Sequence, residues 1–104
     1  MLPPALAAML SPEAAAVDET TRLEAWLWFL HLARVRGGAN CAAGTAVVRG
    51  RRVHATDTDS RVRIVLQADS LRGDDRVLVD RAVTDGRRIL EVVAEMLAAL
   101  EAPR

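Results

Sequence analysis

The chain has 104 residues, which is enough for one domain and one hydrophobic core and too few for an additional catalytic domain. Hydrophobic residues make up 51% of it, yet only two Trp and one Phe are aromatic, so we expect an aliphatic, alanine-rich core. The formal net charge is zero, and all 14 basic residues are arginine, which fits a GC-rich bacterial genome. The single cysteine, Cys41, excludes an internal disulfide and a cysteine-based zinc site, and it fits a reducing cytoplasm.

The N-terminal stretch is not typical of a secretion signal, because it lacks a basic start and is interrupted by Pro3, Pro4 and Pro12. No apolar run approaches the roughly 20 residues that cross a membrane as a helix. We therefore expect a cytoplasmic protein without a membrane partner.

Charge is distributed unevenly along the chain. Residues 1–21 contain acids but no arginine, and residues 64–104 are weakly acidic. Residues 22–63 contain eight arginines against three acids, namely Arg22, Arg34, Arg36, Arg49, Arg51, Arg52, Arg61 and Arg63 against Glu24, Asp57 and Asp59. A surface that faces phosphates is expected in this middle block.

Two helix starts are expected before residue 25. Residues 11–13 (Ser-Pro-Glu) can begin a short helix, because serine is a common N-cap and proline is favoured at the first helical position. A stronger helix is predicted from Thr21, where residues 21–24 fit a capping box, to the glycine pair at 37–38. Its apolar positions recur at steps of three and four residues and form one buried stripe: Leu23, Trp26, Leu27, Leu30 and Ala33.

The centre of the chain favours short strands. We expect a helical turn or two over residues 39–43, then strands over 45–48 and 52–54 around Gly50. Residues 61–66 begin with polar and apolar residues in alternation, and residues 76–80 are rich in β-branched side chains. These two segments are predicted to pair antiparallel across a turn at residues 72–75.

The last element is predicted to be an amphipathic helix over residues 87–100, which docks on the sheet or on a partner through Ile89, Leu90, Val93, Met96, Leu97 and Leu100. The predicted organisation is an extension (1–20), a domain (21–84) and a C-terminal helix (85–104). The fold class is α+β, a single small domain in which two N-terminal helices pack on a small, mostly antiparallel sheet, followed by the C-terminal helix.

Three segments resemble one bacterial family. Residues 22–28 (Arg-Leu-Glu-Ala-Trp-Leu-Trp) are similar to the Arg-Leu-Asp-Lys-Trp-Leu-Trp opening of the ribosome-associated fifteen-kilodalton heat-shock protein family, which carries an S-four-type RNA-binding domain. Residues 34–36 fall where that family has Lys-Thr-Arg, and residues 44–50 keep its glycine spacing. Residues 74–88 resemble its last strand and the Thr-acid-x-Arg-Arg before its final helix, so the resemblance covers residues 22 to about 98.

The resemblance implies a shallow platform that receives the backbone of a structured RNA. It implies that arginines at the helix ends and around Gly50 gather on one face and contact phosphates, and that two histidines at basic positions of the family hydrogen-bond the RNA. The implied RNA-binding residues are Arg22, His31, Arg34, Arg36, Arg49, Arg51, Arg52 and His54. We interpret Trp26 and Trp28 as core residues, and we expect no catalytic residue, metal site or cofactor.

The implied function is non-enzymatic binding of ribosomal RNA on the large ribosomal subunit, in a heat-shock or stalled-ribosome stress response. The family pattern is broken at several expected contacts, including Ala25 for Lys, His31 for Arg and residues 54–56 for Lys-Pro-Ser, and its long basic C-terminal tail is absent. Two alternatives therefore stay open. One is a protein interaction module with weak self-association through the C-terminal helix, and the other is an accessory RNA-binding subunit of an RNA-modifying enzyme.

Overall fold

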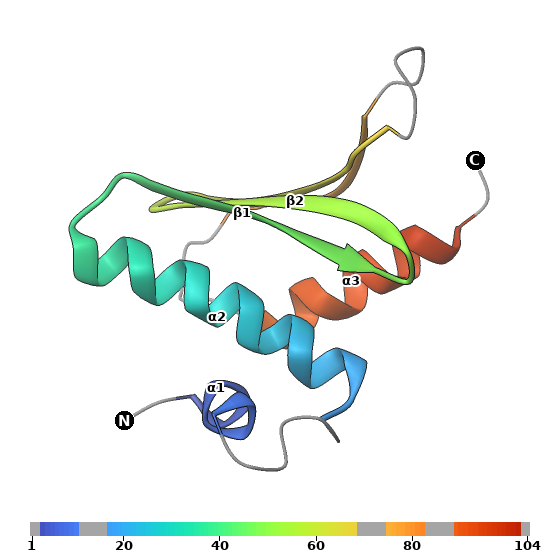
Figure 1. Cartoon of the computed structure of the whole chain (residues 1–104). Helices are drawn as coiled ribbons and strands as arrows, with labels where there is room; N and C mark the ends of the chain where they lie inside the picture. The colour runs from blue at the N-terminus through green and yellow to red at the C-terminus, as the bar shows by residue number, and fades with distance from the viewer. Residues whose placement is uncertain (1–2, 11–16, 69–74, 83–88, 103–104) are drawn as a thin grey trace.

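The computed structural model describes residues 3–10, 17–68, 75–82 and 89–102. The described elements follow in the order α1 (Pro4–Met9), α2 (Glu19–Gly37), β1 (Cys41–Val48), β2 (Arg51–Thr58), β3 (Arg61–Leu66), β4 (Arg76–Ala82) and α3 (Ile89–Glu101). The predicted α+β class with an antiparallel sheet is confirmed (Figure 1). No helix in the described part of the chain is both long and apolar enough to cross a membrane.

The strands form one antiparallel sheet in the order β1-β2-β3-β4. Figure 1 shows α2 and α3 on one side of this sheet, which we call the covered face, and no described element on the other side, the open face. Side chains alternate between the two faces along each strand, as β-geometry requires. The row Gly44, Ala55, Ile64 and Val79 crosses the covered face from edge to edge.

The hydrophobic core lies between the covered face and the two helices. It is aliphatic, as composition predicted, and its largest fully buried side chains are Val53, Ile64, Val79, Val93 and Met96. Trp26 and Trp28 are partly buried and pack against this core, as expected for structural tryptophans. The sheet and both helices therefore form one packing unit around a shared apolar layer.

Helix α2 begins earlier than predicted and ends where predicted. Asp18 is its N-cap and accepts a hydrogen bond from the backbone N–H of Thr21 at 2.8 Å, so the predicted start at Thr21 is wrong. Aspartate is as good a cap as threonine, and the extra turn adds intrahelical hydrogen bonds. At the other end Gly38 adopts φ 64°, a left-handed conformation that glycine tolerates, and ends the helix.

The helical turn predicted over residues 39–43 is wrong, because Cys41 already begins β1. This strand pairs with β2 along its whole length, from Cys41 opposite Thr58 to Val48 opposite Arg51. The two-residue turn of Arg49 (φ 52°) and Gly50 (φ 77°) connects the strands with the positive φ values that favour a tight hairpin. The long-range pairing overrides the helix propensity of the alanines, and both strands are longer than predicted.

The predicted pairing of residues 61–66 with residues 76–80 is confirmed. The pairing contains a β-bulge, because Ile64 faces Val79 while Val65 faces Val77, and Leu78 is the additional residue on β4. Of the predicted turn at 72–75, residues 72–74 lie outside the described residues.

Helix α3 has the predicted amphipathic pattern and docks on the sheet rather than on a partner. Ile89, Val93, Met96 and Leu100 are buried as predicted, but Leu90 is 55% exposed and Val92 is buried in its place. The apolar stripe expected to serve self-association is thus covered by the chain itself. The predicted start at Arg87 lies outside the described residues.

The N-terminal helix α1 was not predicted, and the predicted start at residues 11–13 lies outside the described residues. Pro4 occupies the first helical position, which proline favours. Figure 1 shows α1 against the side of α2 that faces away from the sheet, and Ala5 and Ala25 are both buried. Helix α2 is therefore apolar on two sides, one toward the core and one toward α1.

Candidate nucleic-acid interface

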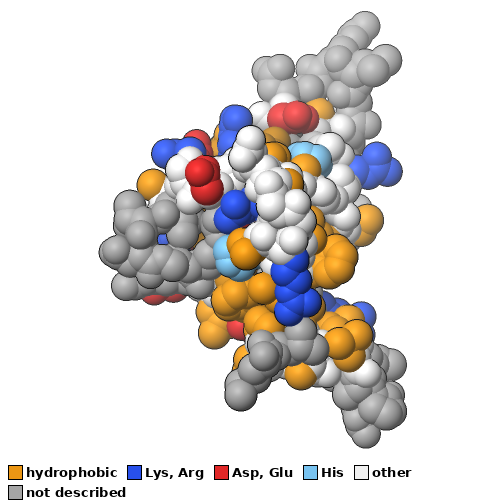
Figure 2. Space-filling view, turned by 90° about the vertical axis from the view of Figure 1, so that its left-hand side faces the viewer, with side chains coloured by type: hydrophobic (Ala, Val, Ile, Leu, Met, Phe, Trp, Pro, Cys, Tyr) orange, Lys and Arg blue, Asp and Glu red, His pale blue; other side chains and the backbone are white. Residues whose placement is uncertain are grey.

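The eight residues predicted to bind RNA do not share one face. Two of them are partly buried against Asp57, one is held in a surface ion-pair network, and the rest are spread over α2, the start of β2 and the open face. Figure 2 likewise shows basic side chains dispersed over the end of the molecule that it views, not gathered in one patch. The expectation that six arginines converge on one platform is therefore wrong.

Arg34 and His31 face the core side of α2 and meet a buried carboxylate. The Nε of Arg34 donates to Oδ1 of Asp57 at 2.7 Å, and Nδ1 of His31 lies 3.8 Å from the same oxygen. Asp57 is only 4% exposed, and it is the one buried charged residue in the described ranges. His31 also makes an edge-to-face contact with Trp28, with ring centroids 5.7 Å apart. This cluster serves the fold, because its charges satisfy one another away from solvent.

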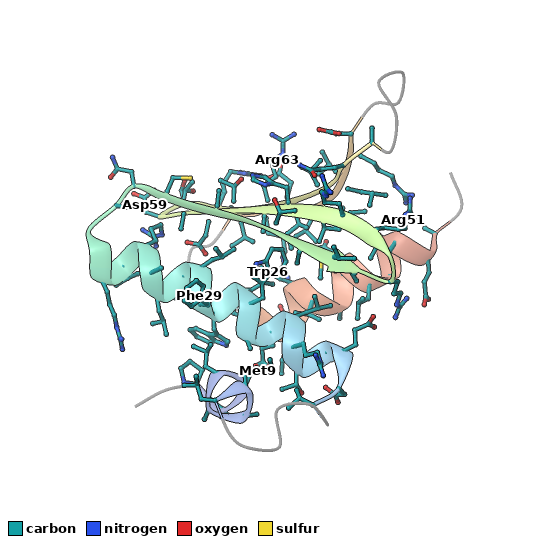
Figure 3. All side chains as sticks on the ribbon, viewed as in Figure 1. Met9, Trp26, Phe29, Arg51, Asp59 and Arg63 are labelled. Atoms are coloured by element: carbon teal, nitrogen blue, oxygen red, sulfur yellow. The ribbon has the colours of Figure 1, made fainter. Side chains whose placement is uncertain are left out.

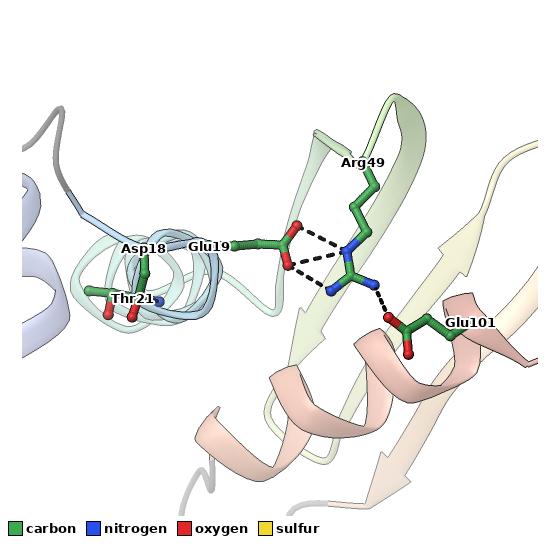
Figure 4. A network of polar contacts seen from close by, with 5 residues as sticks. All are labelled: Asp18, Glu19, Thr21, Arg49 and Glu101. Atoms are coloured by element: carbon green, nitrogen blue, oxygen red, sulfur yellow. Dashed lines mark hydrogen bonds and ion pairs between the residues drawn. The ribbon is translucent and has the colours of Figure 1, made fainter.

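Arg49 connects three elements at the opposite end of the molecule. It donates to both carboxylate oxygens of Glu19, the first residue of α2, and to Glu101, the last residue of α3 (Figure 4). Hydrogen bonds to Glu19 first, and to Glu101 second, raise the pKa of the Arg49 guanidinium above its ordinary value. An RNA phosphate would have to displace two carboxylates to bind here.

Three further predicted residues are accessible but lie apart. Arg22 is exposed near the start of α2, where its Nε donates to the carbonyl oxygen of Val17 at 2.9 Å. Arg36 is exposed near the end of α2 and borders an apolar hollow of about 310 Å³ between α1 and α2, which Phe29 also lines. Arg51 begins β2, and strand alternation places it on the covered side of the sheet.

Arg52 and His54 lie on the open face, together with two arginines that the prediction did not include. The register places Arg61 and Arg63 of β3 on this same face, and Figure 3 shows Arg63 on the side of the sheet away from the helices. The sequence contained a signal for these two arginines. They alternate with Val62 and Ile64, and a period of two directs both of them to solvent.

The open face is defined by four cross-strand rows. They contain, from the β1-β2 turn onward, Val47 and Arg52; Thr45, His54, Val65 and Val77; Ala43, Thr56, Arg63 and Asp80; and Cys41, Thr58, Arg61 and Ala82.

The face carries an excess of positive charge. Arg61 pairs with Asp80 at 2.7 Å, which leaves Arg52 and Arg63 without a carboxylate partner among the described residues. Thr45 and His54 lie within hydrogen-bond distance of each other, with 3.2 Å between Oγ1 and Nδ1. The face offers guanidinium groups, hydroxyls and one imidazole on a rigid sheet, and none of these residues is Trp, Tyr or Phe. It is suited better to binding an anionic backbone than to stacking bases.

Among the described residues no group of three or more His, Cys, Asp or Glu side chains is placed to hold a metal ion. Cys41 is exposed at the start of β1.

The chain matches no protein-family model, no curated protein and no solved structure.

Proposed function

We propose that this protein binds RNA through the phosphate backbone, and that the open face of the sheet is the binding surface. The observation that carries the proposal is the pair of arginines, Arg52 and Arg63, that lie on this face without a carboxylate partner in the described part of the chain. Guanidinium groups bind phosphate oxygens in bidentate geometry, and a rigid sheet holds them at fixed spacing.

Neighbouring groups on the face support the same activity. Hydroxyls and imidazoles are common donors to phosphate and sugar oxygens, and Thr45, His54 and Thr56 lie on the strands between and beside the two arginines. The aromatic residues Trp26, Trp28 and Phe29 belong to α2, on the other side of the sheet. Recognition is therefore proposed to follow the shape and charge of a structured RNA and not its base sequence.

The finer parts of the proposal come from the resemblance to the heat-shock protein family. They place the protein in the cytoplasm, with ribosomal RNA of the large subunit as its partner and a stalled-ribosome stress response as its setting. The S-four-type family itself belongs to this part of the proposal. The proposed binding surface, the open face of the sheet, differs from the platform of helix-end arginines that the resemblance implied.

A protein interaction module is the second candidate. It is favoured by the apolar side chains that share the open face with the arginines, since Val47 is 71% exposed and Val77 is 46% exposed. Exposed apolar groups on a flat face are typical of protein contact surfaces.

Binding to labelled ribosomal RNA fragments and to purified ribosomal subunits, measured over a salt series, tests the proposal. Phosphate contacts predict that affinity falls steeply as salt increases. Two double variants with equal net charge separate the surfaces. The variant Arg52→Ala with Arg63→Ala removes the open-face pair, and the variant Arg22→Ala with Arg36→Ala removes the exposed pair on α2.

We expect the open-face variant to lose at least about tenfold in affinity and to show a shallower salt slope, because about two phosphate contacts are removed. The α2 variant should bind as the wild type does. Loss of binding only in the α2 variant would move the site to the helix ends, and no binding by the wild type at low salt would favour the interaction module. Preference for the large subunit over bulk RNA tests the ribosomal part separately.

A further inference from the structure

The two edges of the sheet differ in a way that bears on assembly. The edge strand β4 carries Arg76, Asp80 and Arg81 and contains a β-bulge, two features that discourage another strand from pairing with it. The edge strand β1 has eight residues, Cys41–Val48, with no charge, no proline and no irregularity in its register. One edge is therefore protected against strand addition and the other is open to it.

The outer side of β1 exposes backbone hydrogen-bonding groups. Among the described elements β2 is its only neighbour in the sheet, and Val48 faces Arg51 across a two-residue turn. Residues that flank such a turn bond to each other, and bonded residues alternate along an antiparallel pair. Every second residue of β1 therefore directs its N–H and C=O away from β2, and these are the residues whose side chains lie exposed on the open face: Cys41, Ala43, Thr45 and Val47.

We propose that β1 pairs antiparallel with β1 of a second copy of this chain and joins the two sheets into one. Residues whose N–H and C=O point away from β2 must pair with residues of the same kind in the second copy. The two-fold axis therefore passes beside Gly44 or beside Thr45, and about seven residues of each strand overlap. In either register small and uncharged side chains face each other across the axis. A strand that meets its own sequence here meets no like charge.

The composition of the edge selects a second copy over an unrelated partner strand. A foreign strand needs a complementary pattern to be specific, and β1 offers neither charges nor large side chains to specify one. Two-fold pairing needs only that the strand fits its own sequence, and a strand of small, uncharged residues meets this condition. The axis stands perpendicular to the sheet, so the helices of both copies lie on one side and both open faces lie on the other.

The dimer has a consequence for the proposed RNA-binding surface, although it does not depend on that function. The open faces of the two copies become continuous, so that Arg52 and Arg63 of both copies lie on one surface. Oligomeric state is measured without RNA, so a failure of this proposal and a failure of RNA binding are distinguished.

Sedimentation velocity of the full chain over a range of concentrations, under reducing conditions, tests the dimer. Thr45 and Val77 lie in the same cross-strand row on opposite edges, which provides a matched pair of variants. Each of Thr45→Lys and Val77→Lys adds one positive charge to the same face, but only the first lies on the edge proposed to pair. We expect Thr45→Lys to raise the dimer dissociation constant at least about tenfold and Val77→Lys to leave it unchanged.

A distance measurement adds a readout that needs no amino-acid substitution. Cys41 is the only cysteine and is exposed at the start of β1, so one nitroxide label per chain can be attached. Antiparallel pairing about Gly44 or Thr45 separates the two labelled backbones by about 20–27 Å, which is six to eight strand residues of ~3.4 Å. Pulsed electron resonance resolves this range.

A monomeric wild type at high concentration would overturn the proposal, as would a dimer whose label distances lie well outside this range. Equal effects of Thr45→Lys and Val77→Lys on the dissociation constant, with unchanged circular dichroism, would also overturn it. A dimer that is weakened only by Thr45→Lys and that gives the expected distance would support it.

Discussion

The Nε of Arg34 donates a hydrogen bond to Oδ1 of Asp57 across the interface between α2 and β2, at 2.7 Å. The side chain of Arg34 is 11% exposed and that of Asp57 is 5% exposed, so this ion pair lies largely out of solvent. It joins the last turns of α2 to β2, beside the core residue Val62, which pairs with Asp57 in the sheet. An arginine that the family resemblance assigned to RNA thus has a partner inside the fold.

Replacing Asp57 with alanine removes the buried carboxylate and leaves the largely buried Arg34 guanidinium without it. Uncompensated buried charge is costly, and we expect Asp57→Ala to lower the free energy of unfolding by about 3 kcal/mol, measured by urea denaturation. The matched control is Asp80→Ala, which removes a carboxylate that is 41% exposed and pairs with Arg61. That loss should stay below about 1 kcal/mol, because water screens exposed pairs. Equal losses in the two variants would contradict the buried role of Asp57.

The close approach of α2 to β1 depends on Gly44. A Cβ at this position would lie 3.1 Å from Cδ2 of Leu30 and 3.4 Å from Nε1 of Trp26. We expect Gly44→Val to lower the free energy of unfolding by about 1–3 kcal/mol, because its side chain overpacks the covered face. Ala43→Val makes a change of similar size one residue away on the open face, and it should stay within about 0.5 kcal/mol of the wild type. Equal effects of the two substitutions on the free energy of unfolding, measured by urea denaturation, would contradict the role of Gly44.

Local signals predicted much of the fold. The end of α2 at a glycine pair, the pairing of β3 with β4 and the amphipathic α3 all follow from residues that are close in sequence or periodic. The helical turn predicted over residues 39–43 was wrong because the helix propensity of its alanines is outweighed by long-range pairing with β2, a pairing that begins at Cys41. The start of α2 was misplaced because Asp18 and Thr21 are both good caps.

The candidate site was less predictable than the fold, because an arginine's availability depends on acids that lie far along the chain. Arg34 pairs with a carboxylate 23 residues away, and Arg49 pairs with one that is 52 residues away. Spacing within one segment carries no information about such partners. Arg63, in contrast, lay in an alternating segment whose period already directed it to solvent.

The ion pairs of Arg49 are predicted to stabilise the fold and not to bind RNA. Arg49→Ala removes the link between the start of α2 and the end of α3, and we expect a lower melting temperature at low salt. The difference from the wild type should shrink as salt increases, because screening weakens exposed ion pairs. Arg51→Ala is the control, since Arg51 has no carboxylate partner in the described residues. This substitution should leave the melting temperature unchanged at all salt concentrations. An RNA-affinity loss in Arg49→Ala as large as that of the open-face double variant would contradict this role.

The N-cap of α2 predicts a dependence of stability on pH in the acid range. The hydrogen bond from Thr21 lowers the pKa of Asp18 below its ordinary value, because it favours the charged carboxylate. Since the folded-state pKa lies below the unfolded value of about 3.9, the stabilising contribution is present in full above that value. It is lost as the pH falls through the folded-state pKa.

Urea denaturation at a series of pH values from neutral to strongly acidic measures this contribution. We expect Asp18→Ala to be less stable than the wild type near neutral pH, with the difference shrinking below about pH 4. Asp18→Asn keeps a good cap but cannot ionise, so its stability relative to Asp18→Ala should not change over the same range. A wild-type advantage over Asp18→Ala that persists at low pH would show that the charged form of Asp18 is not what stabilises the start of α2.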